Sequence, residues 1–410
     1  MSYDVLVVGA GPAGSITAYD CAKAGLRTLL LEKSKHPREK PCGGAVMYRG
    51  LHILRGKLPA SLVERRINGL RFLFPNGDAV EFSSKKLIGI TVFRDLFDEF
   101  LAKRAAAAGV ELREMTKVKR AYTGSNGAAV HTDDGQDIKT RFLVGADGVN
   151  SVVAKSLGLR PPRKNLHRVG LGMESDFYVG EEGVMKSTNG NPSILEIVPV
   201  DGRVAYGWVF PKGEHLCIGI AGAAAHMYPL RPAFDTFVRK TEKRLGVPLK
   251  LEKRRVHFLG ADGISSKNVR DHVLLVGDAA GFVDPMMGEG IAYAMKSGVH
   301  AADVITRAAE LGRYDEHYLE QYHRLCRKEF GANFAVAEWA GLRGTSFAET
   351  VLKMAASYHR ASDIMVKIAR GEIGYSAIPY EIVKSLPREL PKVIQYVVRS
   401  RVNNSPRKGS

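Results

Sequence analysis

The chain has 410 residues, of which 45% are hydrophobic and 25% are charged, as expected for a globular protein of two or three domains. Its 60 basic and 43 acidic residues give a formal net charge of +17, which favours anionic partners such as phosphate-bearing substrates or acidic lipids. The sequence has no run of roughly 18 apolar residues, signal peptide, metal-like cysteine spacing or nucleic-acid module, so we expect a cytoplasmic protein without a metal site or nucleic-acid partner.

The first predicted elements form a dinucleotide-binding unit. An apolar strand over 3–8 runs into a glycine-rich turn over 9–14, which opens a helix. The glycines permit a tight turn, close approach of a pyrophosphate and close helix packing, while the helix N-terminus favours the phosphate charge. A second strand over 27–31 ends where a carboxylate is expected on the adenosine ribose. The cofactor contacts predicted in this unit are Gly9, Gly11, Pro12, Ala13, Gly14, Glu32 and Lys33.

A loop, a hairpin and a helix follow. Residues 40–45, Lys-Pro-Cys-Gly-Gly-Ala, come just after the second strand and are called the Cys-Gly-Gly loop below. The alternating pattern over 69–82, folded at Asn76-Gly77, predicts a β-hairpin. A helix is expected over 93–108, with Arg94 in its first turn.

Two further glycine-rich segments each place a carboxylate at the end of a buried strand. The first runs from 142 to 151 and carries Asp147, and the second runs from 272 to 278 and carries Asp278. Residues 284–291 then lead into a predicted helix over 292–302.

An all-β insert lies between these two carboxylates. Strands are expected over 193–199, 204–211 and 216–222, because turn residues at 201–202 and 212–213 separate them, and this arrangement predicts consecutive antiparallel strands. The middle strand carries Tyr206, Trp208 and Phe210 at alternate positions. We expect this sheet to offer one face to a substrate.

The opening turn together with Asp147 and Asp278 resembles the flavoprotein hydroxylases and reductases related to para-hydroxybenzoate hydroxylase. This resemblance implies FAD as cofactor, with Asp278 on the ribityl chain, Arg94 beside the cofactor, and the N-terminus of the 292–302 helix stabilising the anionic reduced flavin. The further FAD contacts implied are Asp147, Gly148, Gly277, Gly288, Gly290 and Ile291, and the second resemblance given below adds Cys42, Gly43 and Gly44 of the Cys-Gly-Gly loop.

The predicted fold class is α/β, with a Rossmann-type FAD-binding domain, an inserted antiparallel substrate domain and a C-terminal helical region. We assign 1–66, 92–165 and 266–313 to the FAD-binding domain, 67–91 and 166–265 to the substrate (catalytic) domain, and 314–410 to the helical region.

The Cys-Gly-Gly loop and the segment from Tyr206 to Pro211 resemble the geranylgeranyl reductase family, in its archaeal digeranylgeranylglycerophospholipid reductase form. The resemblance implies saturation of geranylgeranyl C=C bonds by hydride from reduced FAD. Arg203 stands where the family often has proline. The residues implied at the reacting bond are Cys42, Tyr206 and Trp208, with Cys42, Tyr206 or a water molecule as proton donor. The substrate-lining residues implied are Tyr206, Trp208, Phe210, Pro211, Met286 and Met287.

The substrate would be a prenylated anionic lipid or geranylgeranyl diphosphate, so we expect peripheral membrane contact. The segment 383–402 mixes apolar and basic residues, and two interpretations stay open for it: an interfacial helix or a terminal helix packed on its own domain. The external electron donor, NAD(P)H or ferredoxin, and a reductase partner also stay open.

Two alternative functions compete with prenyl reduction. An FAD-dependent monooxygenase or halogenase would share the fold, and a halogenase would need Lys85 or Lys86 as its catalytic lysine. A non-catalytic prenyl-lipid carrier would not need an intact flavin site, whereas all three cofactor motifs are complete here.

Overall fold

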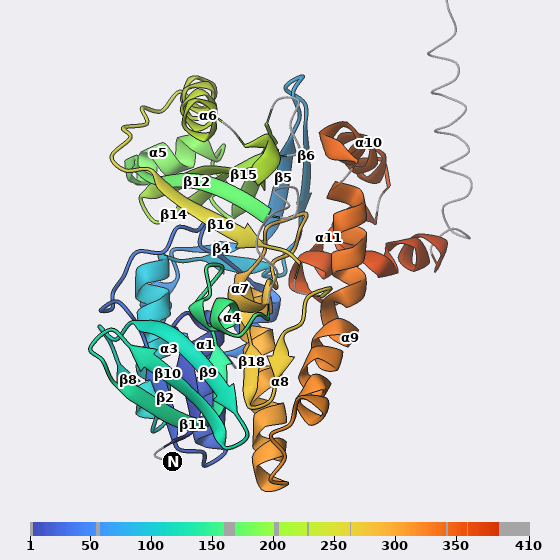
Figure 1. Ribbon diagram of the computed structural model, residues 1–410. Helices are drawn as coiled ribbons and strands as arrows, with labels where there is room; N and C mark the ends of the chain where they lie inside the picture. The colour runs from blue at the N-terminus through green and yellow to red at the C-terminus, as the bar shows by residue number, and fades with distance from the viewer. Residues whose placement is uncertain are drawn as a thin grey trace, which may run out of the picture.

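The computed structural model describes residues 3–54, 58–159, 169–200, 205–227, 229–262, 264–341, 343–358 and 360–384 (Figure 1). The chain forms a lower, mainly parallel sheet with helices, an upper sheet with its own helices, and a group of helices along one side of both (Figure 1). The predicted α/β class with an inserted sheet and a helical end is confirmed.

The lower sheet has the strand order β17-β18-β11-β1-β2-β8, in which the five strands from β18 to β8 are parallel and β17 is antiparallel. The side chains of β2 are fully buried and those of β1 nearly so, as expected for strands covered on both faces. The strand bounds are β1 Tyr3–Val8, β2 Thr28–Leu31, β8 Glu111–Arg113, β11 Asp137–Gly145, β17 Val269–Arg270 and β18 Val273–Leu275.

A hairpin that the sequence analysis did not predict extends this sheet. Strands β9 (Val118–Gly124) and β10 (Gly127–Thr132) pair with each other, and β10 pairs antiparallel with β11. The signal was present in the sequence, because Asn126-Gly127 lies between two alternating segments.

Helix α1 packs against β1 and β2 and lies between α3 and α8. It begins at Pro12, within the glycine-rich segment, and proline suits this first position because it lacks the N–H that the first helical turn leaves unpaired. The helix bounds in this part are α1 Pro12–Lys23, α3 Arg94–Ala107, α4 Val152–Ser156, α7 Gly277–Ala280 and α8 Ile291–Glu310.

The upper sheet has the order β16-β12-β15-β14-β13-β5-β6. The three strands predicted around the aromatic segment are confirmed as consecutive antiparallel neighbours. The sheet is not wholly antiparallel, because β5 from the predicted hairpin pairs parallel with β13, where the two inserts meet. The strand bounds are β5 Gly69–Leu73, β6 Ala79–Ser83, β12 Val169–Tyr178, β13 Ile194–Pro199, β14 Ala205–Lys212, β15 His215–Ala223 and β16 Arg255–Gly260.

One face of the upper sheet is covered by α6, whose Phe234 and Phe237 join an apolar cluster with residues of β12, β14 and β15. The associated helices are α5 Gly180–Ser187, η2 Ala224–His226 and α6 Leu230–Leu245.

A small sheet joins the two larger ones. Its order is β3-β7-β4, and β7 lies beside β14 of the upper sheet. Its elements are β3 Ala45–Met47, α2 Tyr48–Ile53, η1 Ala60–Leu62, β4 Arg65–Ile67 and β7 Gly89–Thr91.

The chain is helical from residue 316, as predicted after about Tyr314, with α9 Glu316–Gly341, α10 Gly344–Ala356, α11 Ala361–Arg370 and η3 Tyr375–Ala377. Helix α11 packs on the β5–β6 hairpin. Arg203, the turn at 201–202, the tail at 405–410 and all but the first two residues of 383–402 lie outside the described residues. Within the described residues no helix is both long and apolar enough to span a bilayer. The domain boundaries stay a prediction.

Candidate functional site

In the glycine turn between β1 and α1, two glycines are required by close packing, and a third faces open space. Gly9 has a φ of +104°, and a Cβ atom there would lie 2.4 Å from the Ala146 carbonyl oxygen. A Cβ at Gly14 would lie 1.9 Å from the Gly9 carbonyl oxygen. At Gly11 the nearest atom would be Nη2 of Arg38, 3.9 Å away. The turn therefore leaves its Gly11 side accessible to a ligand, next to a cation.

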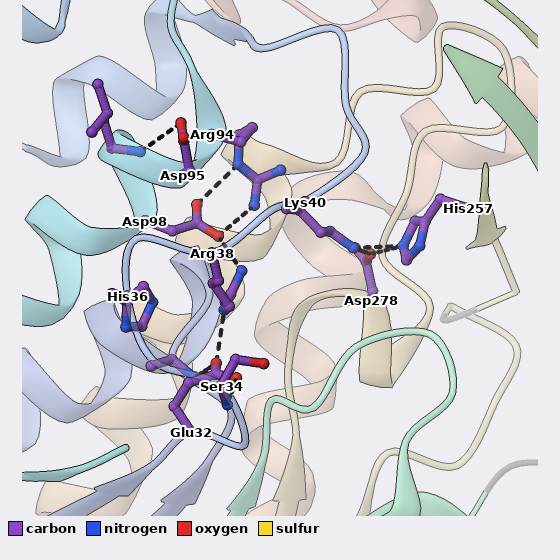
Figure 2. Close-up of polar contacts among 12 residues, drawn as sticks. Glu32, Ser34, His36, Arg38, Lys40, Arg94, Asp95, Asp98, His257 and Asp278 are labelled. Carbon is purple, nitrogen blue, oxygen red and sulfur yellow. Dashed lines mark hydrogen bonds and ion pairs between the residues drawn. The ribbon is translucent and has the colours of Figure 1, made fainter. Parts of the chain in front are cut away.

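Glu32 ties this turn to Arg38. The buried carboxylate accepts hydrogen bonds from the backbone N–H groups of Ala10, at 3.1 Å, and Ser34, at 3.2 Å, and it pairs with Arg38 at 3.1 Å (Figure 2). Lys33, predicted as a neighbouring contact, is exposed.

Arg38 and Arg94 share one buried carboxylate. Arg94 Nε and Nη2 donate to the two oxygens of Asp98, each at 2.9 Å, and Arg38 Nη1 donates to Asp98 at 3.1 Å (Figure 2). Arg94 is only 8% exposed, so it is no solvated helix charge. Asp98 therefore holds the guanidinium groups of Arg38 and Arg94 side by side, next to the glycine turn.

Lys40, His257 and Asp278 form the next polar group along this surface (Figure 2). Lys40 Nζ lies 2.5 Å from His257 Nε2 and 3.8 Å from Asp278 Oδ2, and His257 comes from β16 of the upper sheet. Burial opposes ionisation of Asp278, but the hydrogen bond from His257 and the charge of Lys40 outweigh it and lower the pKa to about 2. Asp278 therefore stays ionised at neutral pH, ready to accept hydrogen bonds.

The Cys-Gly-Gly loop lies directly against the aromatic strand β14. A Cβ at Gly43 would come within 2.9 Å of the Phe210 ring and 3.2 Å of Trp208 Nε1. Gly44 has a φ of +75°, and its Cβ would lie 2.2 Å from the Val92 carbonyl oxygen. Glycine at both positions is what allows the loop to pack this closely against the aromatic strand and Val92.

Tyr206, Trp208 and Phe210 form a continuous aromatic surface on one face of β14. Their ring centres are 6.1 and 6.2 Å apart in sequence order. The Tyr206 hydroxyl donates to the Met287 carbonyl oxygen at 2.8 Å, so the strand is joined to the loop before α8. That loop is shaped by Asp284, which accepts from the N–H groups of Met286 and Met287.

The comparisons with known proteins agree with this geometry. Residues 2–335 match the model of the FAD binding domain family. The chain is 31% identical over 331 residues to digeranylgeranylglycerophospholipid reductase of Methanocaldococcus jannaschii, covering 78% of this chain and 81% of that protein. It is also 31% identical to geranylgeranyl diphosphate reductase of Rhodobacter capsulatus, covering 76% and 77%. The chain belongs to the geranylgeranyl reductase family of FAD-binding proteins.

A solved structure of a geranylgeranyl bacteriochlorophyll reductase-like protein from Thermoplasma acidophilum superposes with a TM-score of 0.76 at 23% identity, over 97% of this chain and 98% of that one. Flavin-dependent halogenases and brominases share the fold as well. The fold alone therefore does not distinguish reductase from halogenase.

FAD, the cofactor of this family, fits the residues present. The open Gly11 side of the turn and the adjacent Arg38 suit a pyrophosphate, and Glu32 lies where the ribose is expected. Gly290 is the N-cap of α8, and a Cβ there would lie 3.7 Å from Asp278 Oδ1, so the helix N-terminus and this carboxylate face the same place. Gly277, with a φ of +55°, lets α7 pack on Ala13.

Asp147 differs from Asp278 although the sequence presents them as a repeat. Its Oδ2 accepts hydrogen bonds from the N–H groups of Val152 and Val153, at 2.6 and 3.2 Å, so it satisfies the first turn of α4, whose N-cap residue is Ser151. Its other oxygen is buried and has no partner among the described residues. Gly148, with a φ of +79°, makes the turn after it. Cofactor contact by these two residues stays a prediction.

Of the residues predicted to line the substrate cavity, Pro211 does not share the aromatic surface. Side chains alternate along a strand, and the opposite face of β14 packs on α6, where a Cβ at Gly207 would overlap the Phe237 ring. Pro211 is buried on that face, and its carbonyl accepts from Thr91 Oγ1 at 2.7 Å. Met287 packs in the same apolar cluster as Phe210. A side chain at Gly288 would overlap the Tyr206 hydroxyl.

A charged cluster behind the Cys-Gly-Gly loop was missed by sequence analysis. Glu174 accepts from the Cys42 N–H at 3.4 Å and pairs with Arg255 at 2.7 Å, and Lys212 pairs with Asp176 at 3.0 Å. Burial raises the pKa of Glu174, although Arg255 opposes this. The only signal in the sequence was the presence of charged residues at buried strand positions, which require partners from other strands.

A second missed cluster joins the loop before α8 to the C-terminal helices. Arg49 donates to Tyr293 and to the Ile368 carbonyl oxygen, and it lies 3.4 Å from Glu289. Burial raises the pKa of Glu289 to about 7 against the charge of Arg49. Tyr375 donates to Asp284 at 3.0 Å, which fixes the same loop from the C-terminal side.

Proposed function

We propose that this protein reduces C=C bonds of geranylgeranyl chains carried by an anionic lipid. The observation that carries the proposal is the contact of the Cys-Gly-Gly loop with the Trp208 and Phe210 side chains, beside the FAD-binding residues. An isoprenoid chain has no polar handle along its length, so only an apolar, aromatic surface can hold its double bond in place. Reduced FAD, when bound, supplies the hydride for this reaction.

The chain's own residues would orient the alkene and exclude water. Tyr206, Trp208 and Phe210 offer the apolar surface, and Met287 closes it from the loop before α8. Cys42 and Tyr206 are the side chains proposed to supply or hold the proton for the second carbon. Burial raises the pKa of Tyr206, and its hydroxyl already donates to Met287, so Cys42 or a water beside it is the better placed of the two.

For the head group we propose a glycerophospholipid with two geranylgeranyl chains, as named for the archaeal relative, rather than a free diphosphate. The net charge of +17 suits either one. Because such a lipid resides in bilayers, we also propose peripheral membrane association. Co-sedimentation with anionic liposomes would support it, and failure to co-sediment with either anionic or neutral liposomes would contradict it.

The deciding experiment is anaerobic. The purified protein is reduced with dithionite and mixed with a digeranylgeranyl phospholipid or with geranylgeranyl diphosphate, and flavin reoxidation and product mass are followed together. Gain of one H₂ per saturated bond, with reoxidation, supports prenyl reduction and identifies the head group. Unchanged lipid mass, with rapid reoxidation by air and a hydroxylated or halogenated product, would contradict it.

The halogenase alternative has weaker support in the geometry. Lys85 and Lys86 are both exposed, just after the end of strand β6. The carrier alternative would leave the ionised Asp278 and the Arg38–Glu32 pair without a role.

A further inference from the structure

A groove on the helical side of the lower sheet is separate from the proposed substrate surface. It has a volume of about 670 Å³ and lies between α1, α2, α3 and α8, with β4 and β7 along its edge. This volume falls within the range of about 300–1,000 Å³ that is usual for pockets holding small ligands.

The floor of the groove is apolar. Six partly exposed aliphatic side chains contribute to it: Leu51, Ile53, Leu58, Val63, Leu87 and Val299. They belong to the apolar cluster that also contains Ile291 and contacts Cys42, so the floor is the outer side of the core behind the Cys-Gly-Gly loop. A partly exposed apolar surface of this kind is a site for a hydrocarbon ligand.

Two arginines on the lining are not neutralised by a described carboxylate. The guanidinium of Arg104 stacks on Tyr19, 4.3 Å from the ring centre, and its Nη1 is buried without a hydrogen-bond partner among the described residues. A buried, unpaired donor costs free energy that an anionic ligand would recover.

Arg66 is the second of these arginines. It is exposed on β4, and the residues that the structure describes offer it no carboxylate, whereas the adjacent Arg65 pairs with Glu181. The remaining lysine of the lining, Lys296, is paired with Glu329 at 3.2 Å. Asp20 also lines the groove. Among the described residues, the lining thus carries two arginines that no ion pair engages, Arg66 and Arg104, against the one carboxylate of Asp20.

We propose that this groove binds one hydrocarbon chain of an anionic membrane lipid, with the phosphate of the head group at Arg66 and Arg104. The site is additional to the flavin-side surface and does not depend on the reductase function. A protein chain as occupant is disfavoured, because an apolar floor with a cationic edge matches the division of a lipid into chain and phosphate.

The test counts lipids on the FAD-loaded protein by native mass spectrometry, with geranylgeranyl diphosphate as probe, while the flavin absorbance reports binding at the flavin. We expect two lipids on the wild-type protein. Val299→Trp fills the groove and should remove one lipid while the flavin response persists. Leu58→Trp, at another lining residue, tests the same point if Val299→Trp does not fold.

Arg104→Gln should weaken the second binding event at least tenfold for geranylgeranyl diphosphate and leave the binding of uncharged geranylgeraniol unchanged. Lys103→Gln is the matched control, because Lys103 is the preceding residue of α3, its side chain is 72% exposed, and it pairs with Glu99. It should bind like the wild type.

Equal lipid counts and affinities in wild type and both tryptophan variants would overturn the proposal. So would a dimer in solution that these variants dissociate, because a second copy of the chain would then be the occupant. A different result would separate the two proposals. If the lipid does not change the flavin absorbance of the wild-type protein, but the tryptophan variants still lose one bound lipid, the proposed function is contradicted and the groove site is supported.

Discussion

The Tyr206 hydroxyl donates a hydrogen bond to the Met287 carbonyl oxygen, 2.8 Å away, and so joins the upper sheet to the loop that begins α8. A Cβ at Gly288 would lie 2.2 Å from the same hydroxyl oxygen, which explains the glycine beneath it. The tyrosine is thus placed to position a loop as well as to line a substrate surface.

Tyr206→Phe should therefore lower the stability of the protein without removing the proton donor of the reaction. We expect a loss of about 1–3 kcal/mol in the free energy of unfolding, because the Met287 carbonyl loses its partner. The rate of lipid reduction should fall less than about 100-fold, since removing a general acid typically costs 10²–10⁴. Stopped-flow reduction of the lipid measures this, and a larger fall with unchanged FAD content would make Tyr206 the proton donor.

Gly11 and Gly14 should respond differently to alanine. Gly11→Ala has room for its Cβ in the protein itself, so it should fold normally and lose FAD, because the methyl group occupies the approach of the pyrophosphate. Gly14→Ala places a Cβ 1.9 Å from a carbonyl oxygen and should lower the free energy of unfolding by at least about 3 kcal/mol. Flavin content and thermal unfolding of both proteins check this. A stable Gly14→Ala protein would be incompatible with the packing described.

Gly43→Ala tests the contact between the Cys-Gly-Gly loop and the aromatic strand. Its Cβ would press on the Phe210 ring at 2.9 Å and on Trp208, so the strand must shift, and we expect turnover to fall roughly tenfold to a hundredfold. Gly124→Ala is the control, because a Cβ there meets nothing within 4 Å. Equal turnover in both variants would show that the aromatic surface is not involved in the reaction.

The stability of the protein should depend on pH through Glu289. Its folded-state pKa is about 7, above the ordinary value of 4.5, so the native state binds more protons than the unfolded state between these values. Stability is therefore highest below about pH 4.5 for this group and falls as the pH rises to about 7, by on the order of 3 kcal/mol.

Glu289→Gln should flatten this dependence, as measured by thermal unfolding at a series of pH values between 4.5 and 7. The variant Glu310→Gln, at the exposed opposite end of α8, serves as the control and should keep the slope of the wild type. An unchanged slope in Glu289→Gln would assign the pH dependence to other groups.

The local motifs could be predicted from the sequence because the conformation of each depends on only a few neighbouring residues. The glycine turn, the hairpin at Asn76-Gly77 and the alternation of Tyr206, Trp208 and Phe210 all depend on short-range geometry, and their elements are present as predicted. The β9–β10 hairpin had the same kind of signal at Asn126-Gly127 and was overlooked.

The polar partners were not readable, because they come from distant segments. His257 reaches Lys40 across 217 residues of sequence, and Arg255 reaches Glu174 across 81. No periodicity records such pairs, since each side chain alone has the pattern of an ordinary strand residue. Asp147 is a similar case, because a buried strand followed by a glycine-rich segment with an aspartate leads to two different geometries at Asp147 and Asp278.

The parallel pairing of β5 with β13 has a consequence for the order of folding. Gly69 pairs with Ile194, so during synthesis the β5–β6 hairpin exists long before the strand that completes its edge. Until β13 emerges, that hairpin presents unpaired backbone groups and an apolar face that α11, from still later in the chain, will cover. The pairing of β5 with β13 joins segments that are far apart in the chain, so it is expected to form slowly. Changes in the hairpin should therefore affect the yield of folded protein more than the stability of the native state.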